Sequence, residues 1–160
     1  IATGVSTFCG QNLGAGKTDR IKKGILQGVF VGMAYGLVAG IVLIFFGRTL
    51  TLLFVKPSAT AVLDASAKYL RCLGFFYWSL GILNTCRMTT QGLGYSGRAI
   101  LSGAVEMAAR CFFSLALVPI FHFDAICFAD QSAWITATLY IVPTCLLVVR
   151  SIEKKRKECK

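Results

Sequence analysis

Acidic and metal-binding side chains are scarce in this sequence. Its 160 residues include only seven Asp and Glu and a single histidine, His122. None of the seven cysteines forms a C-x-x-C pair, so neither a zinc site nor a redox site is expected. Charged residues make up 15% of the chain and hydrophobic residues 56%, which is not typical of a soluble domain. The sequence therefore predicts a membrane protein without catalytic residues, metal or cofactor, and not an enzyme.

The net charge of +10 does not indicate nucleic-acid binding, because the basic residues lie in short clusters between long apolar runs. One cluster follows GQNLGAGKT, which has the Gly-Lys-Thr ending of a phosphate-binding loop. That loop also requires glycine at position 11, where this chain has Gln11. The stretch is better interpreted as a glycine-rich turn whose basic residues face lipid phosphates.

The first residues, IATGVSTFC, look like the end of a helix, and no secretory signal pattern precedes them. We therefore expect the chain to be part of a longer protein.

Residues 24–46 read GILQGVFVGMAYGLVAGIVLIFF and form the most distinctive stretch. About 20 apolar residues span a bilayer core of roughly 30 Å, and in lipid the helical backbone has no better partner than itself. Glycine recurs here at every fourth residue, which places a smooth ridge along one helix face. The ridge predicts tight packing against a neighbouring helix, either as a fixed contact or as one that slides. Its members are Gly24, Gly28, Gly32, Gly36 and Gly40.

The apolar runs predict an all-helical, polytopic membrane bundle with the end of one span at residues 1–9 and four full spans. These full spans are residues 25–46, 69–91, 99–121 and 133–149, the last with a kink at Pro143. Residues 10–23, 47–68, 92–98 and 122–132 are the expected connectors, although residues 125–129 could already begin the last helix. Residues 150–160 are a basic tail.

The basic residues are distributed unequally between the two ends of these spans. Eleven of the 17 Lys and Arg fall on the side of the first connector, the 92–98 turn and the tail, and four fall on the opposite side. The positive-inside rule then places the tail in the cytoplasm.

Two charged residues lie within the third span. Glu106 and Arg110 are four residues apart and share one helix face. A lone charge at this depth costs about 2.5 kcal/mol or more, so each must pair with the other, with another helix or with water. They are either a structural ion pair or residues that act in ion coupling or gating. Arg87, near the end of the second span, is expected to reach the lipid headgroups.

A polar and aromatic face is expected along the second span. Tyr77, Asn84, Met88 and Gln91 recur at helical spacing, with a gap at Gly81. Such a face points into the bundle, where it either lines a substrate path or forms hydrogen bonds between helices.

The order of these elements resembles the multidrug and toxin extrusion (MATE) family. The resemblance rests on GQNLGAGKTDR, the glycine-rich span, the stretch AKYLRCLGFFYWSLGILNTCRMTTQGLGYSGRA, the Glu106–Arg110 span and the kinked last span with its basic tail. It implies a twelve-helix antiporter, of which this chain is the incomplete second lobe. Residues 69–94 contain no acidic residue, whereas some members of the family carry a cation ligand in the corresponding span.

The resemblance also implies a function and partners. We expect a secondary active transporter of the plasma membrane that exports drugs or other organic cations in exchange for sodium ions or protons. Its expected partners are the lipid bilayer, the first lobe of the same transporter and a small amphipathic or cationic substrate, and not nucleic acid. Two alternatives are a related flippase that exports lipid-linked or polysaccharide precursors and a membrane assembly module that transports nothing.

Overall fold

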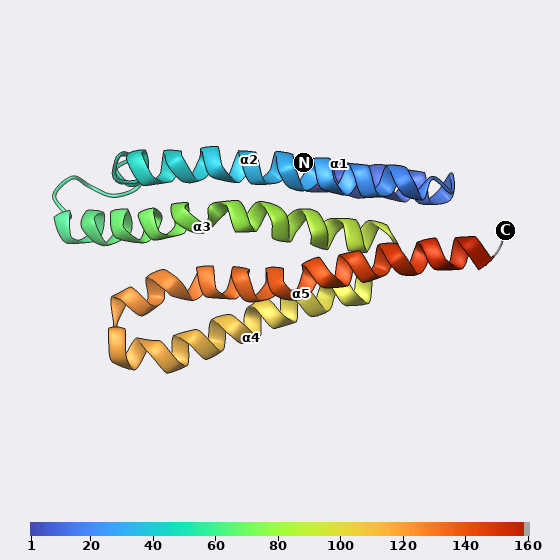
Figure 1. Ribbon diagram of the computed structural model, residues 1–160. Helices are drawn as coiled ribbons and strands as arrows, with labels where there is room; N and C mark the ends of the chain where they lie inside the picture. The colour runs from blue at the N-terminus through green and yellow to red at the C-terminus, as the bar shows by residue number, and fades with distance from the viewer. Residues whose placement is uncertain (159–160) are drawn as a thin grey trace.

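The computed structural model describes residues 1–158 as five helices joined by short turns (Figure 1). The helices are α1 (Ala2–Gly14), α2 (Thr18–Thr51), α3 (Thr60–Gly92), α4 (Ser96–Phe121) and α5 (Phe123–Glu158). The predicted all-helical fold is confirmed, since these residues contain no strand. Cys159 and Lys160, the last residues of the expected basic tail, lie outside the described residues.

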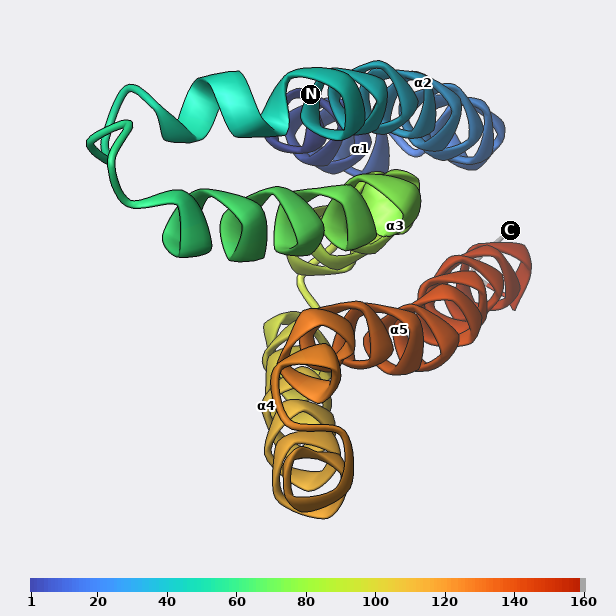
Figure 2. The same cartoon turned by 90° about the vertical axis from the view of Figure 1, so that its left-hand side faces the viewer.

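Helix α3 lies at the centre of the arrangement. Helices α1 and α2 pack on one side of it, and α4 and α5 form a hairpin on the other (Figures 1 and 2). Tight turns connect α1 to α2, α3 to α4 and α4 to α5. Glycine supplies the positive φ that the first two of these turns require, 64° at Gly16 and 88° at Gly94.

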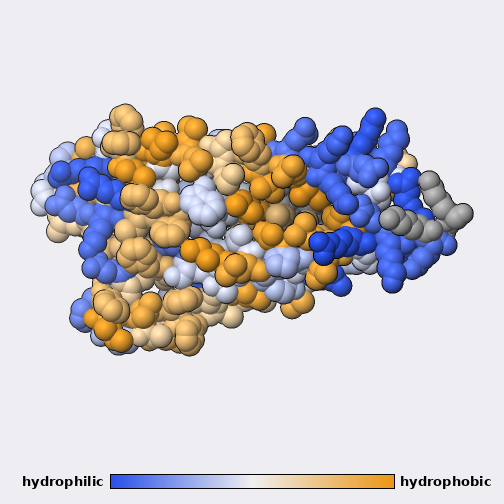
Figure 3. All heavy atoms as spheres, in the orientation of Figure 1, coloured by the Kyte–Doolittle hydropathy of each residue, from blue (hydrophilic) through white to orange (hydrophobic). Residues whose placement is uncertain are grey.

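Three helices, α2, α4 and α5, are long and apolar enough to cross a membrane. The space-filling view shows a hydrophobic middle with hydrophilic residues at both ends of the bundle (Figure 3). Helix α3 is also long, at 33 residues, but it is not among these three candidates. The predicted number of four full spans is therefore not confirmed by length and composition.

Two expected connectors are shorter than predicted. Helix α1 continues through the GQNLG stretch, so that residues 15–17 alone separate it from α2, and Thr18 and Asp19 belong to the first turn of α2. After α2, residues 52–59 form the loop that leads into α3.

The connector predicted at residues 122–132 is almost absent, and the alternative that residues 125–129 already belong to the last helix agrees better with the structure. His122 is the turn, with a φ of 50°, and α5 begins at Phe123. Asp124 and Asp130 made this stretch look exposed, yet both carboxylates pair with basic residues on other helices. Buried Ala125, Ala129, Ala133 and Ala137 recur at every fourth residue of α5 and allow neighbouring helices to approach closely.

All five ridge glycines of α2 are buried. Gly32, Gly36 and Gly40 lie against the backbone of α3, at Gly81, Tyr77 and Gly74, whereas Gly24 and Gly28 lie against Phe8 and Val5 of α1. A Cβ atom at Gly36 would come within 2.8 Å of the Tyr77 carbonyl oxygen and 2.9 Å of the Trp78 Cα. The ridge thus brings two helix backbones into direct contact, which no larger residue permits.

Gly36→Ala should destabilise the protein, because the added methyl group would push α3 away from α2. Overpacking of this kind typically costs about 1–3 kcal/mol. We expect a lower thermal midpoint of the full-length protein in detergent, followed by size-exclusion chromatography of heated samples. Gly103→Ala in α4 is the matched control, since nothing lies within 4 Å of its added Cβ. Equal midpoints for the two variants would contradict this interpretation of the ridge.

Candidate functional site

The candidate site begins with Arg87, which projects from α3 towards α4. Its Nη2 lies 2.6 Å from Glu106 Oε2, and its Nε donates a hydrogen bond of 2.7 Å to Ser102 Oγ. Ser102 is fully buried and stands one turn before Glu106 on α4. The guanidinium of Arg87 is therefore held by two groups on a single helix face.

The ion pairs continue from Glu106 to α5. Arg110 Nη2 lies 3.3 Å from Glu106 Oε1, and Arg110 Nε lies 2.9 Å from Asp130 Oδ1. The hydroxyl of Tyr69, on α3, donates a hydrogen bond to the other oxygen of Asp130. Three helices thus contribute to one charge network, defined here as Tyr69, Arg87, Glu106, Arg110 and Asp130.

The charge network is balanced, with two guanidinium groups and two carboxylates. Glu106 is its most buried charged member, with 17% of the side chain exposed, against 24% for Arg87, 25% for Asp130 and 46% for Arg110. Glu106 touches both arginines, so its charge is compensated on each side. Paired charges can remain in an apolar span, where an isolated charge could not. Chemically, the network can hold three helices together and can respond to any change in the charge of a carboxylate.

The position of the Arg87 side chain differs from the prediction. It was expected to reach the lipid headgroups, but it turns inward because a carboxylate on the neighbouring helix lies within ion-pair distance. Asp130 was missed, since it had been placed in a connector. Both partners could have been suspected from the sequence, because Glu106 and Arg110 needed further charges to satisfy them and few charged residues were available.

The expected polar face of α3 does not converge on one cavity. Tyr77 packs edge-to-face on Trp134 of α5, with ring centroids 6.1 Å apart, and borders the hydrophobic core. Met88 is half-buried, and Asn84 and Gln91 are exposed. Among the described residues, the structure thus gives Tyr77 a packing contact and leaves two of the other three on the surface.

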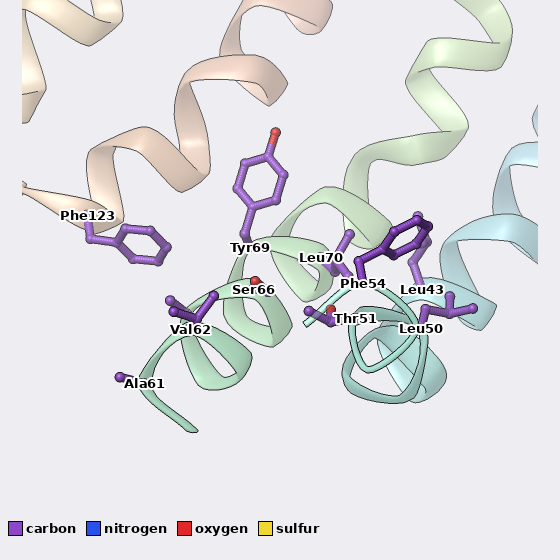
Figure 4. A pocket seen from close by; sticks show the side chains of 11 residues that line it. Leu43, Leu50, Thr51, Phe54, Ala61, Val62, Ser66, Tyr69, Leu70 and Phe123 are labelled. Carbon is purple, nitrogen blue, oxygen red and sulfur yellow. The ribbon is translucent and has the colours of Figure 1, made fainter. Parts of the chain in front are cut away.

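A pocket of about 760 Å³ opens near the beginning of α3, at the end of this helix opposite the turn that leads into α4 (Figure 4). Its walls are mainly apolar and include Phe54 and Phe123, and no carboxylate lines it. Tyr69 lines this pocket and also hydrogen-bonds to Asp130. This tyrosine therefore connects the pocket to the charge network.

A separate ion pair closes the same end of the α3–α5 contact. Lys68 and Asp124 pair directly, and both side chains are about half exposed. The hydrogen bond that Lys68 donates to the Asp124 carboxylate raises the pKa of Lys68 above its usual value, so the ammonium group remains charged at neutral pH. Within the described part of the chain, no group of three or more His, Cys, Asp or Glu side chains could hold a metal ion.

The long apolar helices and the balanced charge network within them define a multi-pass helical membrane protein. A family model described as MatE matches residues 1–116, and the chain belongs to this family of membrane efflux transporters. The match includes Arg87, Glu106 and Arg110 and ends before α5. Comparison with curated proteins gives no match, and comparison with solved structures gives none.

Replacing Arg87 should destabilise the protein more than replacing Arg110. Arg87 is less exposed and holds both Ser102 and Glu106, whereas Glu106 keeps Arg87 when Arg110 is lost. Removing one partner of a buried pair costs about 3–5 kcal/mol, and less for a half-exposed one. We expect thermal midpoints in detergent to fall in the order wild type, Arg110→Gln, Arg87→Gln.

The control is Arg71→Gln on the same helix, because Arg71 is exposed and forms no ion pair with any described residue. It should leave the midpoint unchanged. Replacing Arg87 and Glu106 together by glutamine should recover part of the loss, since the charges that remain, Arg110 and Asp130, are opposite and pair with each other. An Arg87→Gln protein as stable as Arg71→Gln would show that the pair contributes little.

Proposed function

We propose that this chain is part of a plasma-membrane antiporter that exports amphipathic or cationic organic compounds in exchange for sodium ions or protons. Membership of a family of membrane efflux transporters supports the direction of transport. The observation that carries the coupling proposal is the charge network that joins α3, α4 and α5 through Glu106 and Asp130. Carboxylates can take up a proton, which removes their negative charge, or bind a metal cation, which compensates it.

The network supplies a physical route from ion binding to helix movement. If Glu106 or Asp130 takes up the coupling ion, its attraction for the arginines weakens, and so does the contact between the helices that carry them. Arg110 makes the two sites interdependent because it touches both carboxylates. In this proposal α3 crosses the bilayer with its neighbours, and its charged groups are tolerated because they are paired.

The proposal also includes a first lobe of the transporter as the partner of this one. Large apolar side chains on the outer face of α2, such as Phe30 and Phe45, are 68% and 77% exposed. Lipid and a second lobe are the two surroundings that would cover such a face.

Neutralising the network should abolish coupling without unfolding the protein. We choose Arg87→Gln combined with Glu106→Gln, which removes one charge of each sign, and compare it with Asp130→Asn. The measurement is efflux of a fluorescent organic cation from proteoliposomes of the full-length transporter under an imposed sodium or proton gradient. We expect each variant to lose at least tenfold in gradient-driven efflux while it elutes as a folded protein.

Arg71→Gln should transport at the wild-type rate, because Arg71 is outside the network. A folded double variant with normal gradient-driven efflux would assign Glu106 a structural role only. Gradients of sodium and of protons, applied separately to the wild type, identify the coupling ion.

The proposed orientation places the tail in the cytoplasm and the 52–59 loop outside. Ser58, which is exposed in that loop, is a suitable reporter. In a full-length protein without other cysteines, Ser58→Cys should react with a membrane-impermeant maleimide added to intact cells. Reaction only after lysis would invert the topology.

A further inference from the structure

A groove lies between α2 and α5, with residues of α3 contributing to it. Its volume is about 460 Å³, and nine of its eleven lining residues are apolar. Leu26 of α2 and Leu146 of α5 border it and are 71% and 54% exposed. Ile82 of α3 contributes to its floor. The groove therefore opens sideways, towards whatever surrounds the bundle.

The two remaining lining residues are both basic, Lys22 and Arg150. Lys22 Nζ lies 2.7 Å from Glu153 Oε1, so its charge is already compensated in part. Arg150 is exposed and forms no ion pair with any residue that the structure describes. No acidic residue lines the groove. Its mouth thus carries a net positive charge, and Arg150 is the cation available to a ligand.

The order of residues along both helices separates the charges from the apolar walls. On α2, Lys22 stands about one turn before Leu26, and on α5, Arg150 follows Leu146 by one turn. The apolar walls belong to helices that can cross a membrane. The cations therefore lie where an apolar span ends, at the level of lipid headgroups.

We propose that this groove binds one anionic phospholipid, with an acyl chain along the apolar walls and the phosphate at Arg150 and Lys22. Basic pockets between membrane helices are suited to anionic headgroups, and the apolar walls match a hydrocarbon chain. An organic cation does not fit, because the mouth repels positive charge. A neutral lipid would fill the groove but leave Arg150 without a partner. The bound lipid bridges α2 and α5, which touch each other little.

The test is native mass spectrometry of the purified full-length protein in detergent, titrated with dioleoyl phosphatidylglycerol or dioleoyl phosphatidylcholine. We expect one phosphatidylglycerol to bind more tightly than the rest and to be favoured over phosphatidylcholine. A basic residue that contacts an anionic headgroup changes lipid binding about fivefold. Arg150→Gln should therefore weaken this first binding step about fivefold. Val29→Phe, which fills the groove without changing its charge, should weaken it as well.

Lys23→Gln is the matched control, because it removes the same charge from the neighbouring residue of α2, which does not line the groove. It should leave the first binding step unchanged. Equal weakening by Lys23→Gln and Arg150→Gln would reduce the effect to general surface charge and overturn the proposal. So would equal binding of the two lipids, or phosphatidylglycerol binding that survives Val29→Phe. If inorganic phosphate alone displaced the bound phosphatidylglycerol, the groove would be a phosphate site that does not need the acyl chain, and the proposal would be overturned.

Discussion

A charged side chain cannot remain unpaired among membrane-spanning helices, and this constraint determines how the second half of the chain is assembled. Helix α4 buries only Ala99 and Ser102 as complete residues. Among the described residues it contacts α3 and α5 alone. Glu106 and Arg110 of α4 are satisfied only when α3 brings Arg87 and α5 brings Asp130. The requirement for neutral pairs therefore sets the position of α4 more than apolar packing does.

The first half of the chain is held by the opposite kind of contact. Between α2 and α3 the glycines allow the two backbones to touch at Gly32 and Gly40. An exposed ion pair, Arg48 with Asp64, joins the same two helices near the loop between them. Dispersion and the close fit of small residues supply the attraction, as is common between helices in lipid. The glycine part of this contact contains no titratable group.

The sequence predicted the features that depend on local spacing. Twenty-three consecutive residues, 24–46, carried both the apolar length and the glycine period, and all five glycines are buried. Spacing along one helix also suggested that Glu106 and Arg110 meet. What it could not supply was contact between distant residues. Arg87 pairs across a turn, and Asp130 reaches Tyr69 across 61 residues of sequence, so their roles depend on how α3, α4 and α5 are placed in space. The polar residues Asp124 and Asp130 are likewise accommodated within α5, which begins at Phe123, because each pairs with a basic residue of another helix.

Helix α3 contains both kinds of contact, and this indicates which helices would move in the proposed transport cycle. Gly74 and Gly81 bind it to α2, whereas Arg87 and Tyr69 bind it to the α4–α5 hairpin. A coupling ion that neutralises Glu106 or Asp130 weakens only the second set, because the glycine contact contains no titratable group. The hairpin, and α4 above all, is then the part of this lobe free to shift, while α1, α2 and α3 remain one unit. The apolar core shared by Leu83 and Ile141 resists separation of α5 from α3, so the movement that the network favours is a displacement of α4 along both helices rather than detachment of the hairpin.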